Sequence, residues 1–168
     1  MKLSIVTTLY QSAPYINEFH ERATTAAEQL GDEDYEVVFV NDGSPDNSLE
    51  LAVQLTEIDH HVVVVDLSRN FGHHKAMMTG LAHAKGDRVF LLDVDLEEDP
   101  EWLLSFHGEM KEKDCDLVYG LQESRRGGCG ERRTGQCFYW IFKVLTGLAL
   151  PENMVTARLM TRRYVNAL

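Results

Sequence analysis

The feature that most constrains the fold is the alternation of two kinds of hydrophobic pattern along residues 1–121. Short apolar runs rich in β-branched residues recur at 3–8, 36–40, 62–67, 88–92 and 117–119. Between them, apolar residues are spaced three or four apart, as in helices, at 15–30, at 47–58 and after Gly72. A fourth helix is expected to begin at Pro100, with Asp99 as its potential N-terminal cap. This alternation predicts βαβ units. We therefore expect an α/β domain with a mostly parallel sheet and helices on both faces.

The composition is typical of one globular domain. Of 168 residues, 44% are apolar and 26% are charged, which excludes a disordered chain. The longest mostly apolar stretch, 138–150, is shorter than the roughly 20 residues that a membrane-spanning helix needs. The three cysteines lack the spacing of a zinc site, and no secretory cleavage signal follows the N-terminus. We expect a cytoplasmic protein, with the cytoplasmic face of the membrane as an alternative location.

Charge is distributed unevenly along the chain. The net charge is −11 overall, but it is −16 for residues 1–121 and +5 for residues 122–168. An acidic body argues against nucleic acid as a partner. The basic part is expected to face phosphate groups or an anionic membrane surface. A periodic apolar pattern at 158–168 runs to the end of the sequence, so we interpret residues 1–168 as a single domain truncated at its C-terminus.

In a parallel sheet, functional residues are expected at the carboxyl ends of the strands. The first run ends at Thr7 and Thr8, without the glycine fingerprint of a dinucleotide-binding turn, which argues against a dehydrogenase. The second run ends at Asp42, which can accept hydrogen bonds from a nucleoside. The alternative is that Asp42 forms a turn with Ser44 while Asp46 caps the next helix.

The fourth run leads directly into three alternating carboxylates, Asp93, Asp95 and Glu97. In an extended backbone these side chains would point the same way and repel one another unless a cation lay between them. Oxygen ligands of this kind favour Mg²⁺ or Mn²⁺. The alternative is an acidic helix N-terminus, which accounts for the acidic residues of 98–101 but not for Asp93, because Asp93 follows four apolar residues.

A third candidate segment follows the third run. His73, His74 and Lys75 open a predicted helix, and cationic side chains at a helix N-terminus favour an anion such as a pyrophosphate. The alternative is that the two histidines are simply solvated, since neighbouring helical positions seldom bind one metal together. No serine lies in a GxSxG elbow, so nucleophilic catalysis has little support.

Three ordered motifs carry a resemblance to a known family. They are Asn41-Asp42-Gly43-Ser44, Ser68-Arg69-Asn70-Phe71-Gly72-His73 and Leu92-Asp93-Val94-Asp95-Leu96-Glu97-Glu98-Asp99-Pro100-Glu101. In this order they resemble glycosyltransferase family 2 with the GT-A fold, and within it the dolichol- or undecaprenyl-phosphate sugar transferases. The resemblance covers nearly the whole chain and implies a nucleotide-diphosphate sugar as donor.

The resemblance also implies roles for individual residues. Donor-binding residues would be Thr8, Leu9, Tyr10, Asp42, Asp93 and Arg158, and Lys75 is added to them from its place at the start of a predicted helix. Asp93 and Asp95 would be the catalytic pair and, with Glu97, would hold the metal ion. Glu97 stands where lipid-phosphate relatives commonly have glutamine. Arg158 matches the arginine of the family's Phe-Arg-Leu segment, but Val155-Thr156-Ala157 replace the Gly-Asp-Phe that usually precedes it.

These observations predict a metal-dependent hexosyltransferase of cell-envelope biogenesis that uses Mg²⁺ or Mn²⁺ and transfers a sugar to a polyprenyl phosphate. Residues 1–121 would bind the nucleotide, and residues 122–168 would face the acceptor and the membrane. Such an acceptor is already ionised and needs no general base. In the basic part, aromatic residues 138–142 would lie at headgroup depth and four arginines would meet anionic lipid. Those arginines are Arg125, Arg126, Arg132 and Arg133.

Several alternatives stay open. One is a family 2 transferase acting on a saccharide hydroxyl, and another is a nucleotide-binding module without catalysis, which the departures at 155–157 favour. A phosphoacceptor receiver domain is disfavoured, because Thr7 and Thr8 occupy the place of its acidic pair. Relatives continue into two C-terminal transmembrane helices, so the chain is also interpreted as the soluble core of a membrane-associated enzyme. The sequence does not predict the sugar, the base or the oligomeric state.

Overall fold

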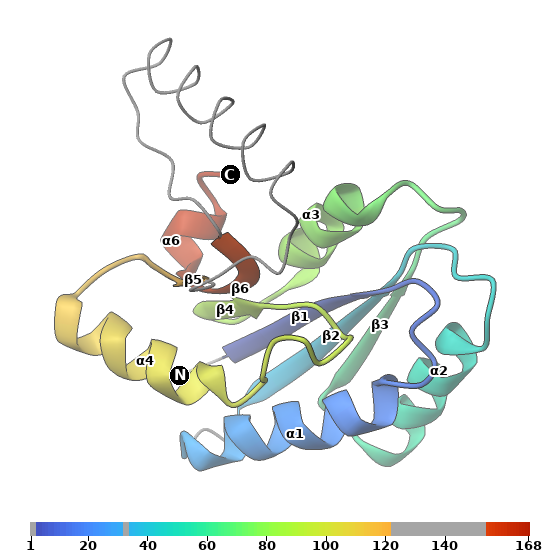
Figure 1. Cartoon of the computed structure of the whole chain (residues 1–168), viewed down its shortest axis with the longest axis horizontal. Helices are drawn as coiled ribbons and strands as arrows, with labels where there is room; N and C mark the ends of the chain where they lie inside the picture. The colour runs from blue at the N-terminus through green and yellow to red at the C-terminus, as the bar shows by residue number, and fades with distance from the viewer. Residues whose placement is uncertain (1–2, 32–33, 122–153) are drawn as a thin grey trace, which may run out of the picture. The chain divides into compact units, whose positions relative to one another are not determined.

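The computed structural model describes residues 3–31, 34–121 and 154–168 (Figure 1). It divides into one unit made of Met1–Tyr119 and Thr156–Leu168 and a second unit, Gly120–Val155. Most of the second unit lies outside the described residues. The predictions for the four arginines and for the aromatic residues 138–142, which fall within 122–153, therefore lie outside them too.

A six-stranded sheet forms the centre of the first unit (Figure 1). Its strands follow the order β3-β2-β1-β4-β6-β5. Their bounds are β1 Leu3–Leu9, β2 Tyr35–Asn41, β3 Val62–Asp66, β4 Arg88–Leu91, β5 Leu117–Leu121 and β6 Met154–Thr161. The first four strands pair in parallel, and β6 pairs with β4 in antiparallel orientation. The carboxyl ends of β1 to β4 consequently meet at one edge of the sheet.

Helices cover both faces of the sheet, as predicted. Their bounds are α1 Ile16–Gln29, α2 Ser48–Ile58, α3 His73–His83, α4 Trp102–Lys113 and α6 Arg162–Val165. On one face, Phe19 of α1 packs edge-on against Phe39, and Phe106 of α4 packs edge-on against Phe90. On the other face, α3 packs on β1 and β2 through a core that includes Ala76.

One glycine explains how α3 approaches the sheet so closely. Gly80 lies on the buried face of α3, and a Cβ atom there would be 2.5 Å from Val6 Cγ1 and 3.0 Å from Val40 Cγ2. Any larger residue would push the helix away from β1 and β2. The small side chain thus sets the distance between α3 and the strands whose ends hold the candidate site.

Two predicted elements were wrong in their bounds or type. The pattern at 158–168 is not one periodic segment, because β6 runs to Thr161 and only a short helix, α6, follows it. Helix α4 begins at Trp102 rather than at Pro100, and no side chain caps its N-terminus. The Asp99 carboxylate instead accepts a hydrogen bond from Arg22 of α1 at 2.7 Å. In the part of the chain that the structure describes, no helix combines the length and hydropathy needed to cross a bilayer.

Candidate functional site

Four loops meet at the edge where the parallel strands end. They follow β1, β2, β3 and β4, and three of them are joined by hydrogen bonds between residues far apart in the sequence. Ser44 Oγ accepts from the backbone N–H of Gln11 at 2.7 Å, and Ser48 Oγ accepts from that of Ser12 at 3.0 Å. The loop after β2 is therefore fixed against the loop after β1.

Asp46 is the centre of this connection. Its carboxylate accepts hydrogen bonds from the hydroxyls of Ser44 and Ser48, both at 2.6 Å, and from the backbone N–H groups of Ser48 and Ala13. Burial tends to raise the pKa of Asp46, but these hydrogen bonds outweigh burial and lower it to about 2. Asp46 was also considered as the cap of the helix after β2, but the N-cap of α2 is Asn47, which makes no side-chain capping hydrogen bond, and Asp46 precedes it.

Asp42 has a different role from the turn considered for it. It is 2% exposed, and its two oxygens accept the backbone N–H groups of Phe71 at 2.7 Å and of Gly72 at 3.0 Å. The turn is formed by Asn41, whose side-chain oxygen accepts the N–H of Ser44. Asp42 thus holds the loop after β3 in place, and any nucleoside would have to use its remaining lone pairs.

His73 connects two strand ends. Its Nδ1 atom lies 3.1 Å from Thr8 Oγ1 at the end of β1, and its Nε2 atom lies 3.4 Å from Asp93 Oδ1 beyond β4. Helix α3 begins at this residue, directly after Gly72, which Asp42 holds. The sequence allowed His73 to be either part of an anion site or simply solvated. In the structure its ring contacts residues at the ends of two strands.

The acidic loop after β4 is a turn and not the extended segment that was predicted. Leu96 has a φ of +61°, and the carboxylate of Asp95 accepts the backbone N–H of Glu97 at 3.1 Å. Asp95 and Glu97 are exposed, whereas the side chain of Asp93 is 31% exposed. The turn still places three carboxylates within five residues at the end of β4.

Glu98 is buried and ties this loop to β6. One of its oxygens accepts the backbone N–H of Thr156 at 2.6 Å. Burial raises the pKa of Glu98, although the backbone N–H groups of Ala157 and Thr156 act in the opposite direction. The interpretation of Glu98 as part of an acidic helix N-terminus was wrong, because its carboxylate faces β6. Sequence reasoning had no signal for this contact, since β6 itself was not predicted.

The remaining acidic residues of this loop bind α1. Arg22 donates hydrogen bonds to Asp99 at 2.7 Å and to both oxygens of Glu101, at 2.8 and 2.6 Å. The Arg22 guanidinium lowers the pKa of Glu101. These two carboxylates are therefore engaged in an ion-pair network, which leaves Asp93, Asp95 and Glu97 as the candidates for a cation.

The other predicted donor-binding residues lie at the same edge of the sheet, but their side chains differ in how far they are exposed to a ligand. Arg158 pairs with Leu91 across β6 and β4, and its Nε donates to the Thr156 carbonyl oxygen at 2.9 Å. Tyr10 is half exposed, but the Leu9 side chain is fully buried and could offer only its backbone. Lys75 is exposed on the first turn of α3.

The chemistry of this edge suits a charged oxygen-rich ligand and a hard cation. Carboxylates such as those of Asp93, Asp95 and Glu97 are ligands that Mg²⁺ and Mn²⁺ accept, with phosphate oxygens completing the coordination. Arg158 and the start of α3 supply positive charge and N–H groups for an anion. The residues present therefore fit a divalent cation bound together with a diphosphate.

Comparison with known proteins agrees with this geometry. A Mycobacterium tuberculosis protein that carries a provisional glycosyltransferase name is 50% identical over 168 residues, which are 100% of this chain and 49% of the relative. The Bacillus subtilis glycosyltransferase YkcC, itself uncharacterized, is 34% identical over 164 residues, 97% of this chain and 50% of the relative. The chain thus spans about half the length of the curated relatives it matches.

Solved structures show the same fold. The mannosyltransferase PcManGT from Pyrobaculum calidifontis, in complex with GDP-Man and Mn²⁺, superposes with a TM-score of 0.65 at 17% identity, over 98% of this chain and 46% of that one. S. aureus TarS 1-349 in complex with UDP gives a TM-score of 0.60 at 26% identity, over 76% of this chain and 37% of that one. The GT-A fold expected from the resemblance is confirmed.

The family can be assigned from the sequence as well. The profile of the family described as glycosyl transferase family 2 matches residues 4–165, nearly the whole chain. The matched region includes all four strand-end loops and β6. This chain therefore belongs to glycosyl transferase family 2.

Proposed function

We propose that this chain binds a nucleotide-diphosphate sugar together with Mg²⁺ or Mn²⁺ and transfers the sugar to an acceptor. The observation that carries the proposal is the position of Asp93 and Asp95 after the carboxyl end of β4, where Asp93 contacts His73 of α3 and Arg158 lies opposite Leu91. The PcManGT structure, which contains GDP-Man and Mn²⁺ and covers nearly the whole chain, supports the proposal.

Each residue at the edge would have a distinct task. Asp95 and Glu97, both exposed, would hold the cation with Asp93. When bound, the cation would stabilise the negative charge that develops on the departing nucleoside diphosphate. His73 would keep Asp93 oriented, since its ring is itself fixed by Thr8. Arg158 would interact with the phosphates.

The acceptor that we propose is a polyprenyl phosphate at the cytoplasmic face of the membrane. The support is the net charge of +5 over residues 122–168, which would attract an anionic surface. A phosphate acceptor is already ionised, so no residue has to remove a proton from it. A saccharide hydroxyl would require a base, and transfer to a soluble sugar with none to the lipid would favour that alternative.

The metal part of the proposal is tested by calorimetry with UDP and with GDP, each with and without Mn²⁺. We expect Mn²⁺ to strengthen binding of one nucleotide in the parent and to have no such effect in Asp95→Asn, which keeps the side-chain shape and removes the charge. Asp99→Asn on the same loop is the matched control, because Asp99 binds Arg22. An equal Mn²⁺ effect in Asp95→Asn and in the parent would show that Asp95 is only a turn residue.

The transfer itself needs a different measurement. Radiolabelled UDP- and GDP-sugars are incubated with undecaprenyl phosphate, with a soluble disaccharide or with neither, using the full-length protein where this chain is part of one. Label in the lipid fraction supports the proposed acceptor. Nucleotide binding without release of nucleoside diphosphate under any of these conditions would identify a binding module in place of an enzyme.

A further inference from the structure

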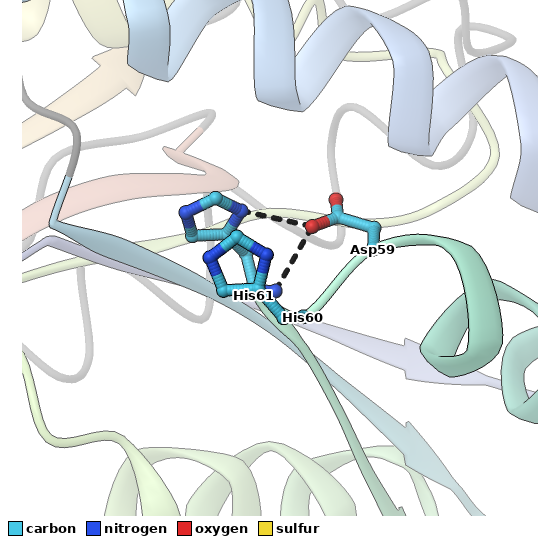
Figure 2. A group of neighbouring side chains, drawn as sticks. All are labelled: Asp59, His60 and His61. Carbon is cyan, nitrogen blue, oxygen red and sulfur yellow. Dashed lines mark hydrogen bonds and ion pairs between the residues drawn. The ribbon is translucent and has the colours of Figure 1, made fainter.

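A cluster of histidines lies away from the donor site, in the turn that joins α2 to β3 (Figure 2). Asp59, His60 and His61 form this turn, and Val62 begins β3. The donor site lies at the carboxyl ends of the parallel strands, whereas this turn precedes the amino end of β3. The two sites are therefore at opposite edges of the sheet, and the function proposed above makes no use of this cluster.

The cluster is organised around the Asp59 carboxylate. Oδ1 accepts the backbone N–H of His61 at 2.9 Å and lies 2.8 Å from His61 Nδ1. Oδ2 lies 2.7 Å from Nε2 of His20, which comes from α1. The His61 ring stacks on Tyr35 with centroids 4.0 Å apart, and the His60 ring lies 3.9 Å from the His61 ring. Two neighbouring imidazoles thus converge on one side of a carboxylate, as Figure 2 shows.

We propose that Asp59, His60 and His61 form a binding site for a divalent transition-metal ion such as Zn²⁺. Each residue offers one ligand atom, and these atoms all lie within 4.8 Å of one another. Two ligand atoms of one tetrahedral Zn²⁺, at its usual N and O bond lengths, are about 3.4 Å apart. Rotation of the exposed His60 side chain would bring its ring nitrogen to that distance from the other two ligand atoms.

The ligand types separate this site from the donor site. Imidazole nitrogens suit zinc, copper and nickel, whereas carboxylates and phosphate oxygens suit magnesium and manganese. A carboxylate binds a metal in its ionised form, and the Asp59 carboxylate already faces imidazole nitrogens of both His61 and His20.

His20 would give the site a structural effect. It contacts the carboxylate oxygen that His61 does not use, and a partner of that kind orients a ligating carboxylate. The contact between His20 and Asp59 already connects α1 to this turn. The folded chain thus holds the Asp59 carboxylate oriented beside the two histidines, and an ion bound there would stabilise the folded chain.

The experiment uses the whole chain with Asp93→Asn and Asp95→Asn, so that the proposed donor-site metal does not contribute. After chelator treatment, Zn²⁺ is titrated against a chromophoric competitor and the unfolding temperature is followed. We expect one Zn²⁺ per chain and a higher unfolding temperature with Zn²⁺. His60→Gln should weaken Zn²⁺ binding at least tenfold and remove the thermal effect.

His83→Gln is the matched control, since His83 is an exposed histidine on α3 whose ring contacts the Thr79 carbonyl oxygen. It should bind Zn²⁺ as tightly as its background. His60 is exposed, so the metal-free unfolding temperature of His60→Gln should match its background and show that the variant is folded. Equal Zn²⁺ affinity in both histidine variants, or no saturable binding at all, would overturn the proposal and leave Asp59 as an acceptor that only shapes the turn. Neither result depends on nucleotide binding.

Discussion

The Nδ1 atom of His73 lies 3.1 Å from the hydroxyl oxygen of Thr8, so the first residue of α3 is attached to the end of β1. The other ring nitrogen lies 3.4 Å from the carboxylate of Asp93. The His73 imidazole therefore links the buried strand β1 to the acidic loop after β4. If Asp93 contributes to metal or donor binding, its orientation depends on a hydroxyl group on a different strand.

Thr8→Val tests this dependence. The substitution keeps the side-chain size and removes the hydroxyl, so the His73 ring loses one of its two contacts. Loss of one hydrogen bond of about 1 kcal/mol corresponds to roughly fivefold weaker nucleotide binding in the presence of Mn²⁺. Calorimetry with UDP and GDP measures the change. Thr79→Val on α3 is the control, because the Thr79 hydroxyl donates to the Lys75 carbonyl oxygen within its own helix. Equal affinities in both variants would contradict the prediction.

Asp42→Ala should affect both binding and stability. The substitution removes the acceptor of the partly buried backbone N–H groups of Phe71 and Gly72, and a hydrogen bond to a charged group contributes about 1.5–3 kcal/mol. We expect a lower unfolding temperature and weaker nucleotide binding, while Mn²⁺ still strengthens what binding remains. Calorimetry with and without Mn²⁺, together with thermal unfolding, measures both effects. Unchanged nucleotide affinity would leave Asp42 a residue that only holds the loop.

Gly43→Ala should be far more disruptive than Gly31→Ala. Both glycines have positive φ, +61° and +74°, so alanine at either position carries a backbone cost of about 1–2 kcal/mol. At Gly43 the new Cβ would also lie 2.5 Å from Asn70 N and 2.6 Å from Arg69 C, whereas at Gly31 no atom of the described residues lies within 4 Å. Gly31→Ala should lower the unfolding temperature by roughly 2–8 °C, and Gly43→Ala by a clearly larger amount. Similar shifts would show that the loop at Arg69 and Asn70 moves aside.

The contribution of Asp46 to stability should disappear in acid. Its pKa in the folded chain is about 2, below the usual 3.8, so the unfolded chain takes up a proton first as the pH falls. The stabilisation is complete above about pH 4 and is lost as the pH falls through 2. Asp46→Ala should therefore unfold more easily than the parent at pH 7, by about 1 kcal/mol, and the difference should be much smaller near pH 2.

Urea unfolding at several pH values measures this difference for Asp46→Ala. Glu57→Ala, on the exposed surface of α2, controls for the general change in charge. A gap between parent and Asp46→Ala that stays constant down to pH 2 would mean that the residue acts through its shape and not through its ionised form.

The parallel part of the fold could be predicted because each element carries its own local signal. Strands β1 to β4 are short β-branched runs, and α1 buries Ile16, Phe19 and Ala23 at helical spacing. β6 could not be predicted in this way. Its partner is β4, far away in the sequence, and the antiparallel register that pairs Leu91 with Arg158 leaves no local pattern.

The same limit applied to the candidate site. Position at a strand end was enough to single out Asp42, Asp93 and Asp95, since the sheet brings the ends of parallel strands together. Contacts between the loops were not visible in the sequence. The attachment of His73 to Thr8 and of Glu98 to Thr156 depends on tertiary packing, and the turn at Leu96 depends on a positive φ that leucine rarely adopts.

The antiparallel pairing of β6 with β4 also bears on how the chain reaches its folded state. Val89, Phe90 and Leu91 are buried in the finished sheet, with β1 on one side and β6 on the other. During synthesis on the ribosome, roughly seventy residues separate β4 from its second partner, and non-local pairing of this kind is slow. Until β6 arrives, an apolar strand edge is open to pairing with other chains. Refolding yield is therefore expected to fall as protein concentration rises, and a variant that weakens the β4–β6 pair should show a steeper fall than the parent.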